Sequence, residues 1–206
     1  MNNPSPLTIV NVGYRSTNYW VISAGTSRLL VDIGWPGTLG AMKANLRKMG
    51  ISLAEIRYAL ATHYHIDHAG LAEELKREGV TLLVMDIQLA AIPLMKKWTK
   101  PEDKFVGITD DGNLIISCEQ SRQFFEGIGI GGEILPTPGH TDHCVSLLLD
   151  DGSVFCGDLP PESSVYDNLM ALASWQLLRE RGARQIYPAH GPIRWIDNPS
   201  ALRPNR

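Results

Sequence analysis

The sequence predicts a layered α/β sandwich in a single domain spanning residues 1–206. Two observations lead to this prediction. Runs of β-forming residues alternate with helical runs along the whole chain, a pattern typical of sheets covered by helices. With 206 residues, 44% of them hydrophobic, the chain can bury one substantial core, and no Ser/Gly-rich or charge-rich linker divides it.

The first half of the chain opens with strands and then alternates helix with strand. In order, its predicted elements are strands at 7–12, 18–24 and 28–33, a helix at 37–49, a strand at 56–62, a helix at 68–78, a strand at 81–84 and a helix at 87–95. Gly50 and Gly79 end the first two helices, because glycine is favoured just after a helix. Pro93 makes the interior of the third helix doubtful.

The second half returns to strands. Its predicted elements are strands at 113–117, 132–136, 144–149 and 153–157, a helix at 167–181 and a last strand at 185–188. Asp150-Asp151-Gly152 is a strong hairpin signal, and Asp110-Asp111-Gly112 is a similar turn. The helix is indicated by Leu169, Leu172, Trp175 and Leu178, which recur every three residues.

One glycine-rich motif is rejected as a nucleotide site. Gly127, Gly129 and Gly132 match G-x-G-x-x-G, but the phosphate-binding version needs a helix after it. Here Glu133-Ile-Leu-Pro-Thr-Pro follows, which cannot open a helix. We therefore expect these glycines to form a turn or a bulge in a strand.

Composition narrows the partners and the compartment. The net charge of -3 gives no overall attraction to nucleic acid, so none is expected as a partner. No apolar run approaches membrane-spanning length, and residues 1–6 lack the basic start and apolar core of a signal peptide. Cys118, Cys144 and Cys156 are odd in number and lack C-x-x-C spacing, which favours reduced thiols. We expect a cytoplasmic protein without a membrane partner, and the sequence does not predict its oligomeric state.

The segment Thr62-His-Tyr-His-Ile-Asp-His-Ala-Gly70 predicts a metal site. Three of the six histidines of the chain and one carboxylate fall within 63–68, directly after an apolar run. If the strand continues through His63 and His65, both imidazoles point to the same side. Asp67 and His68 follow where the chain turns into a helix, so they can approach the same point from a second direction. Imidazole and carboxylate together suit zinc, iron or manganese.

Three further candidate ligands follow predicted strands. His140 ends Pro-Thr-Pro-Gly-His, Asp158 ends a Gly-Asp step, and His190 precedes Gly191-Pro. Strand ends are fixed points from which a rigid scaffold can direct ligands to one place.

Together with Leu30-Val-Asp32-Ile-Gly34, these motifs closely resemble the metallo-β-lactamase superfamily of metal-dependent hydrolases. The resemblance runs from about Asp32 to Gly191 with every ligand motif in order. It implies a four-layer αββα sandwich with metals at one edge between the two sheets. It also implies two divalent metal ions, with zinc as the expected metal and iron or manganese as alternatives. The implied first site is His63, His65 and His140; the second is Asp67, His68 and His190; Asp158 bridges them, and Asp32 steadies ligand orientation.

The resemblance also implies the chemistry. Water shared by two cations loses a proton near neutral pH, and the resulting hydroxide attacks an acyl or phosphoryl centre. Asp67 orients this hydroxide as the catalytic residue. The expected substrate is a small ester, thioester or lactone, and the alternatives are a phosphodiesterase and a mononuclear-iron persulfide dioxygenase. A non-catalytic scaffold would show ligand losses, and none is seen.

Two residues near the motifs receive weaker predictions. His143, three residues after His140, is expected at the surface or behind the ligands rather than on a metal, and it is also a candidate residue of the substrate pocket. Trp35 follows the Asp32-Ile-Gly step and is assigned equally to a pocket wall and to ordinary packing.

Overall fold

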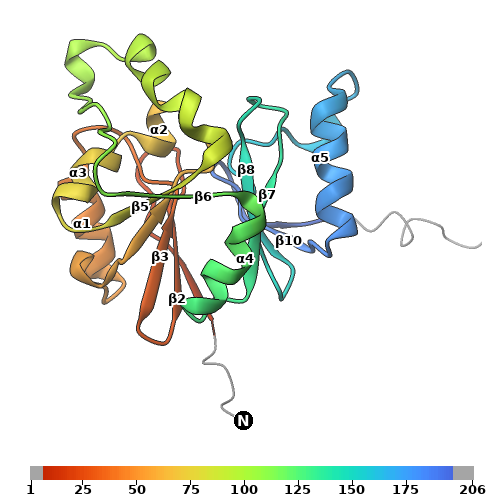
Figure 1. The fold of residues 1–206 in the computed structure, drawn as a ribbon, viewed down its shortest axis with the longest axis horizontal. Helices are drawn as coiled ribbons and strands as arrows, with labels where there is room; N and C mark the ends of the chain where they lie inside the picture. Colours follow the sequence, from red (N-terminus) through yellow and green to blue (C-terminus); the bar gives the residue numbers. More distant parts are fainter. Residues whose placement is uncertain (1–6, 197–206) are drawn as a thin grey trace, which may run out of the picture.

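Two mixed β-sheets lie face to face with helices on their outer sides in the computed structural model, which describes residues 7–196 (Figure 1). The first sheet has the strand order β1-β2-β3-β4-β5-β6, and the second has the order β11-β10-β9-β8-β7. This layered arrangement of two sheets between helices is the one that the resemblance implied.

The first sheet combines an antiparallel and a parallel half. Its strands are β1 (Thr8–Asn11), β2 (Trp20–Ala24), β3 (Ser27–Val31), β4 (Tyr58–Leu60), β5 (Thr81–Met85) and β6 (Asn113–Ile116). The first three strands pair antiparallel, and β3 through β6 pair parallel. Its helices are α1 (Leu39–Lys48), α2 (Ile66–Ala69) and α3 (Ala72–Arg77), with the 3-10 helices η1 (Leu53–Glu55), η2 (Asp86–Trp98) and η3 (Pro101–Asp103).

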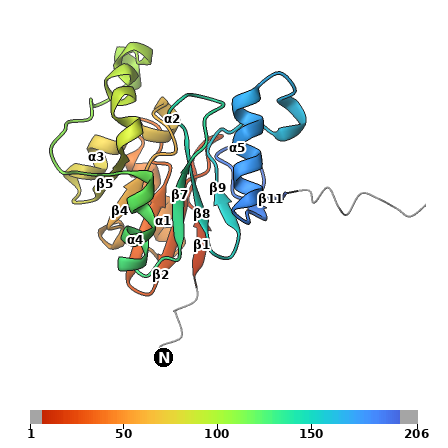
Figure 2. The same ribbon diagram turned by 45° about the vertical axis from the view of Figure 1, so that its right-hand side comes forward.

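The second sheet is mainly antiparallel. Its strands are β7 (Gly132–Pro136), β8 (Val145–Leu149), β9 (Ser153–Phe155), β10 (Gln185–Ile186) and β11 (Arg194–Trp195), and its helices are α4 (Cys118–Gly127), η4 (Glu162–Ser164) and α5 (Leu169–Glu180). Among these described strands only β9 and β10 pair parallel, because α5 forms the crossover between them. Figure 2, turned from the first view, again shows α5 on the outer side of this sheet.

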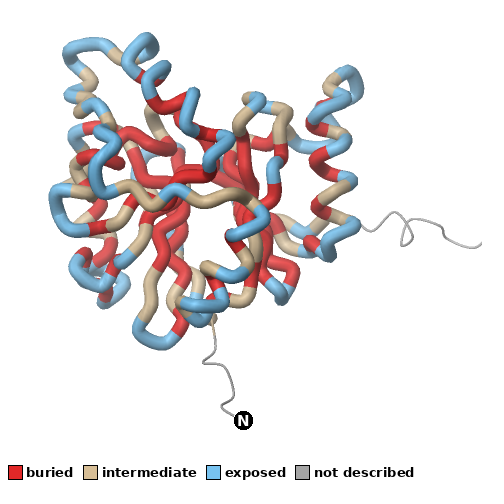
Figure 3. Tube along the Cα trace, in the orientation of Figure 1, coloured by how far each residue is buried: buried red, intermediate tan, exposed pale blue. Residues whose placement is uncertain are grey.

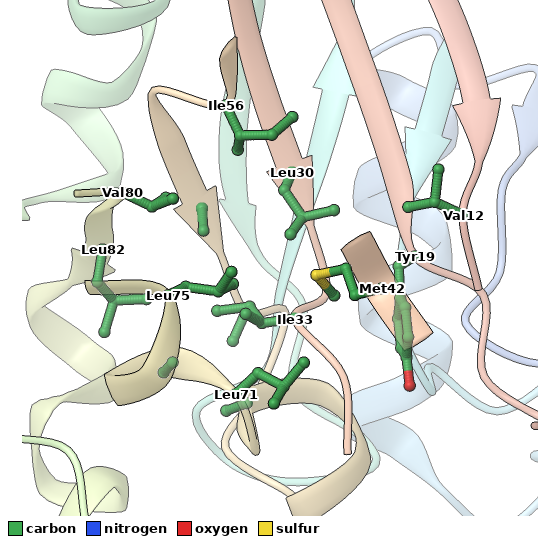
Figure 4. Packing of buried hydrophobic residues seen from close by; sticks show 14 of the residues in the cluster. Val12, Tyr19, Leu30, Ile33, Met42, Ile56, Leu71, Leu75, Val80 and Leu82 are labelled. Atoms are coloured by element: carbon green, nitrogen blue, oxygen red, sulfur yellow. The ribbon is translucent and has the colours of Figure 1, made fainter. Parts of the chain in front are cut away.

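Alternating side chains of the strands build three apolar layers. Leu30 of the first sheet packs with Met42 and Leu75 of the helices that cover it (Figure 4). Val21 belongs to the same cluster as Leu30. Their chain neighbours point the other way and meet the second sheet in a central core, whose members include Ile22, Leu29, Leu60, Leu83, Ile134, Leu147 and Phe155. Leu148 and Val154 pack under Trp175 and Leu178 of α5. The buried trace in Figure 3 accordingly runs through both sheets, and the exposed trace follows the loops and outer helix faces.

The structure corrects several predicted elements. Helix α4 was not predicted, although Ser117 and Gln120 form its capping box, in which Ser117 N donates to Gln120 Oε1 at 2.9 Å. The 127–132 glycines form the turn from α4 into β7, so the turn is confirmed and a bulge within a strand is wrong. The helix predicted at 68–78 is two helices that meet at Gly70 and Leu71. No described helix is long and apolar enough to cross a membrane.

Candidate metal centre

The first sheet supplies four of the candidate ligands from one loop and the short helix after it. Strand β4 ends at Leu60, so His63 and His65 lie in a loop and not on the strand predicted through 62. Strand alternation is therefore the wrong reason for their convergence. The two rings converge all the same, with centroids 4.5 Å apart, because the loop turns into α2 at Ile66. Asp67 and His68 then follow within α2.

The second sheet supplies the other three candidates, each from a loop that follows a strand. His140 comes after β7, Asp158 after β9 and His190 after β10. The structure brings all seven candidates together in three overlapping groups whose ligand atoms lie within 4.8 Å of one another: His63, His65 and His140; His63, His68 and Asp158; Asp67, His68 and His190. His63 and His68 are buried, whereas His140 and His190 are exposed, so solvent reaches the centre from one side.

Asp158 lies between the two outer groups. Its Oδ2 is 3.3 Å from His68 Nε2 and 3.7 Å from His140 Nε2, while its Oδ1 is 3.3 Å from His190 Nε2. Oδ2 therefore faces one histidine of each outer group, and Oδ1 faces a second histidine of the group that contains Asp67. On one side His65 Nδ1 and His140 Nε2 are 3.0 Å apart, and on the other His190 Nε2 is 3.2 Å from Asp67 Oδ2.

Asp32 lies buried behind the centre. Its Oδ1 accepts hydrogen bonds from Thr62 N and Thr62 Oγ1, both at 2.9 Å, and its Oδ2 lies 3.2 Å from His68 Nδ1. A neutral His68 with its proton on Nδ1 presents a lone pair on Nε2 toward Asp67 and Asp158. Asp32 also has φ 59, a left-handed conformation that Asp tolerates better than most residues.

A tight turn between β1 and β2 contacts the centre, and sequence reasoning missed it. Tyr14 and Thr17 form an antiparallel bridge around Arg15 and Ser16. Thr17 Oγ1 donates to Asp67 Oδ2 at 3.2 Å, and His190 Nδ1 donates to the carbonyl of Ser16 at 2.7 Å. Because a carbonyl only accepts, the second bond leaves the lone pair of a neutral His190 on Nε2.

Asn18, directly after this turn, holds the loop of His190. Its backbone N donates to Ala189 O at 2.7 Å, and its side chain donates to the carbonyls of Pro188 and Gly191, each at 2.9 Å. The partners are more than 165 positions apart in sequence. No local motif of a single sequence identifies such a contact.

The N-terminus of α5 holds the loop of His140 in a similar way. Asn168 accepts from Ala171 N at 3.0 Å as the N-cap and donates from Nδ2 to Gly139 O at 2.7 Å. Ser174 Oγ donates to Pro138 O at 2.6 Å. Gly139 has φ 148, and a Cβ there would lie 2.7 Å from that of Ala171, so only glycine allows this approach.

Burial and neighbouring charges set the proton affinities. Burial lowers the pKa of His63 well below its usual range, and the nearby histidines lower it further. Burial also lowers the pKa of His65. For His68 burial acts in the same direction, but Asp32 and Asp158 outweigh it and raise the pKa to about 10. Without bound metal, His68 thus supplies the positive charge that the carboxylates face.

The two residues that received weaker predictions lie at the margin of the candidate metal centre. Trp35 is half-buried against the core of the first sheet, which fits packing, and the guanidinium of Arg15 lies 5.4 Å from its ring centroid. His143 is half-buried and belongs to none of the three ligand groups among the described residues. Cys144 and Cys156 are buried free thiols.

The donor set fits divalent metal ions. His63 Nε2 is buried without a hydrogen-bond partner, and both ring nitrogens of His68 lie close to carboxylates without hydrogen-bonding geometry. Buried polar atoms of this kind need a partner, and imidazole nitrogens facing carboxylate oxygens suit zinc and related ions. These His/Asp clusters are therefore consistent with the metal site that the resemblance implied.

A match to a family model identifies the superfamily of this chain. It belongs to the metallo-beta-lactamase superfamily, whose model matches residues 12–190. Among curated relatives, the Beta-lactamase-like protein 2 homolog of Caenorhabditis elegans is 28% identical over 93% of this chain and 60% of its own length. The Atrochrysone carboxyl ACP thioesterase of Aspergillus terreus is 27% identical over 87% of this chain and 50% of its own. The chain thus spans between half and three fifths of these relatives.

Solved structures share the fold at lower identity. A metallo-beta-lactamase family protein from Thermus thermophilus superposes with a TM-score of 0.70 at 19% identity, covering 91% of this chain and 74% of its own. The BLEG-1 B3 metallo-beta-lactamase gives 0.70 at 18% identity, covering 96% and 100%.

Proposed function

We propose that this protein is a metal-dependent hydrolase that cleaves a small ester, thioester or lactone. The observation that supports this most is the convergence of seven His and Asp side chains from both sheets on one solvent-accessible edge. A relative is named an ACP thioesterase, which supports an acyl substrate. The cytoplasmic location expected from the sequence remains part of the proposal.

Divalent ions bound here would supply water of lowered pKa and a positive charge for the oxyanion that forms on the substrate. His63, His65 and His140 would hold one ion and Asp67, His68 and His190 a second, with Asp158 facing both. Thr17 holds the Asp67 carboxylate in place. Asp67 can then orient the attacking water, take up a proton from it and pass that proton to the leaving group.

Metal stoichiometry tests the two-ion hypothesis. Full-length protein prepared without chelator and supplied with zinc should bind about two ions per chain. Asp158→Ala should lower both metal content and turnover, whereas Asp67→Asn should retain much of the metal and lose turnover. One tightly held iron with an empty second site would favour the persulfide dioxygenase. Unchanged metal content and turnover in Asp158→Ala would exclude its bridging role.

A substrate panel tests the reaction class. We expect the highest kcat/KM on an ester, thioester or lactone in a panel of aryl esters, acyl thioesters, homoserine lactones, phosphodiesters and β-lactams. A phosphodiester exceeding every carboxyl substrate by about tenfold, or about 1.4 kcal/mol in transition-state binding, would assign the protein to the phosphodiesterases instead.

A further inference from the structure

The tight turn from Tyr14 to Thr17 carries a positive charge that the chemistry above does not use. Arg15 is exposed, and no ion pair joins it to another residue within 7–196. The next two residues of the same turn contact the metal centre through His190 and Asp67. Arg15 therefore lies within two residues of both contacts with the centre.

The guanidinium of Arg15 is held by aromatic rings. Its Cζ lies 5.6 Å from the ring centroid of Tyr14 and 5.4 Å from that of Trp35. Contact with ring faces leaves the N–H donors at the edge of the guanidinium free to bind two oxygens of one anion. The rings thus pre-orient the paired N–H donors of the guanidinium, which recognise a carboxylate or a phosphate.

The backbone of Arg15 is strained in a way that glycine would relieve. Arg15 has φ 60 at the first central position of this two-residue turn, where glycine is favoured. A residue held in such a conformation beside a candidate active site points to a use for its side chain.

We propose that Arg15 binds an anionic group of the substrate, a carboxylate or a phosphate, next to the bond that is cleaved. This inference rests on the proposed function, and it narrows the substrate to acyl compounds that carry an oxyanion. Trp35 acts as the support that orients Arg15, which gives its ring a role in addition to packing.

A neighbouring cation provides the matched control. Arg15 and Thr17 also line a polar hollow of about 390 Å³ on whose wall Lys48 lies. An anion bound in that hollow would depend on Lys48 as much as on Arg15. An anion bound between Arg15 and the metal centre would depend on Arg15 alone.

The first experiment compares two esters on the zinc-loaded full chain: mono(4-nitrophenyl) glutarate, which has a free carboxylate, and 4-nitrophenyl valerate, which is neutral. Arg15→Gly should lower the glutarate-to-valerate ratio of kcat/KM by tenfold or more, with valerate turnover within twofold of wild type. Lys48→Ala should leave the ratio unchanged. Arg15→Gly should also keep or raise the melting temperature, whereas a purely structural role for Arg15 predicts a fall.

The second experiment does not depend on turnover, so failure of the proposed function remains distinguishable. Calorimetry on the same proteins measures the dissociation constants of glutarate, 4-phosphonobutyrate and butyrate. Wild type should prefer a doubly charged probe over butyrate, and Arg15→Gly should lose that preference; the better of the two probes identifies carboxylate or phosphate as the group bound. An unchanged preference in Arg15→Gly, or an equal loss in Lys48→Ala, would overturn the proposal.

Discussion

Replacing Asp32 should separate the folding role of this carboxylate from its effect on His68. Asp32→Ala removes both hydrogen bonds from Thr62, at 2.9 Å each, and leaves a buried backbone N–H without a partner. Loss of these bonds costs about 1–3 kcal/mol for each buried donor, and Ala at φ 59 adds about 1–2 kcal/mol. The free energy of unfolding should therefore fall by about 3–8 kcal/mol.

Asp32→Asn should behave differently. Asn tolerates the left-handed conformation and keeps an acceptor for Thr62, so its loss should be less than half that of Asp32→Ala. It lacks the negative charge 3.2 Å from His68 Nδ1, so zinc affinity should fall by about 10- to 100-fold. Urea unfolding of metal-free protein and chelator competition measure the two effects, with exposed Asp110→Asn as control. Equal destabilisation by Ala and Asn, or unchanged zinc affinity in Asp32→Asn, would refute this reasoning.

Three further predictions concern the supports of the centre and of the fold. Gly157→Ala, at φ 55, would bring the new Cβ against Thr62 Oγ1, and the free energy of unfolding should fall by about 2–5 kcal/mol in the same denaturation assay. Gly182→Ala is the control: at φ 92 with nothing within 4 Å, it should lower the free energy of unfolding by about 1–2 kcal/mol. Asn168→Asp keeps the N-cap of α5 but sets a carboxylate against Gly139 O, so zinc affinity measured by chelator competition should fall about tenfold. Asn168→Ser shows the effect of losing the amide alone. Although burial opposes it, bonds from Thr109 and Lys76 hold the pKa of Glu73 below its ordinary 4.5. This stabilises the fold above pH 4.5 and is lost as pH falls through the lowered pKa, so Glu73→Gln should be destabilising at pH 7 by a margin that shrinks as pH falls below 4.5, unlike exposed Glu126→Gln.

The sequence contained enough to predict the layers and the convergence of ligands. Strand periodicity and the glycines after helices placed most elements, because these signals are local. The loop at His63 and His65 was misread as strand, since tertiary contacts and not propensity decide where a short parallel strand stops. Helix α4 was missed although Ser117 and Gln120 carried its capping signal.

The supports of the site could not be predicted in the same way. Asn18 reaches the His190 loop across more than 165 positions, and Asn168 reaches Gly139 across 29. Both are ordinary polar residues whose partners are backbone carbonyls, which every residue offers. Only the packing of one sheet on the other selects those carbonyls.

The ligand groups come from both sheets, and this arrangement couples ion binding to cohesion of the sandwich. Four candidates follow β4 and three follow strands of the second sheet, so a bound ion would tie the two halves together at the edge opposite the β2–β3 hairpin. By mass action, an ion at a hundred times its dissociation constant adds about 2.7 kcal/mol to the folded state. Chelation should then speed amide exchange in β4 and β9 together, so that metal supply would govern the lifetime of the protein as well as its chemistry.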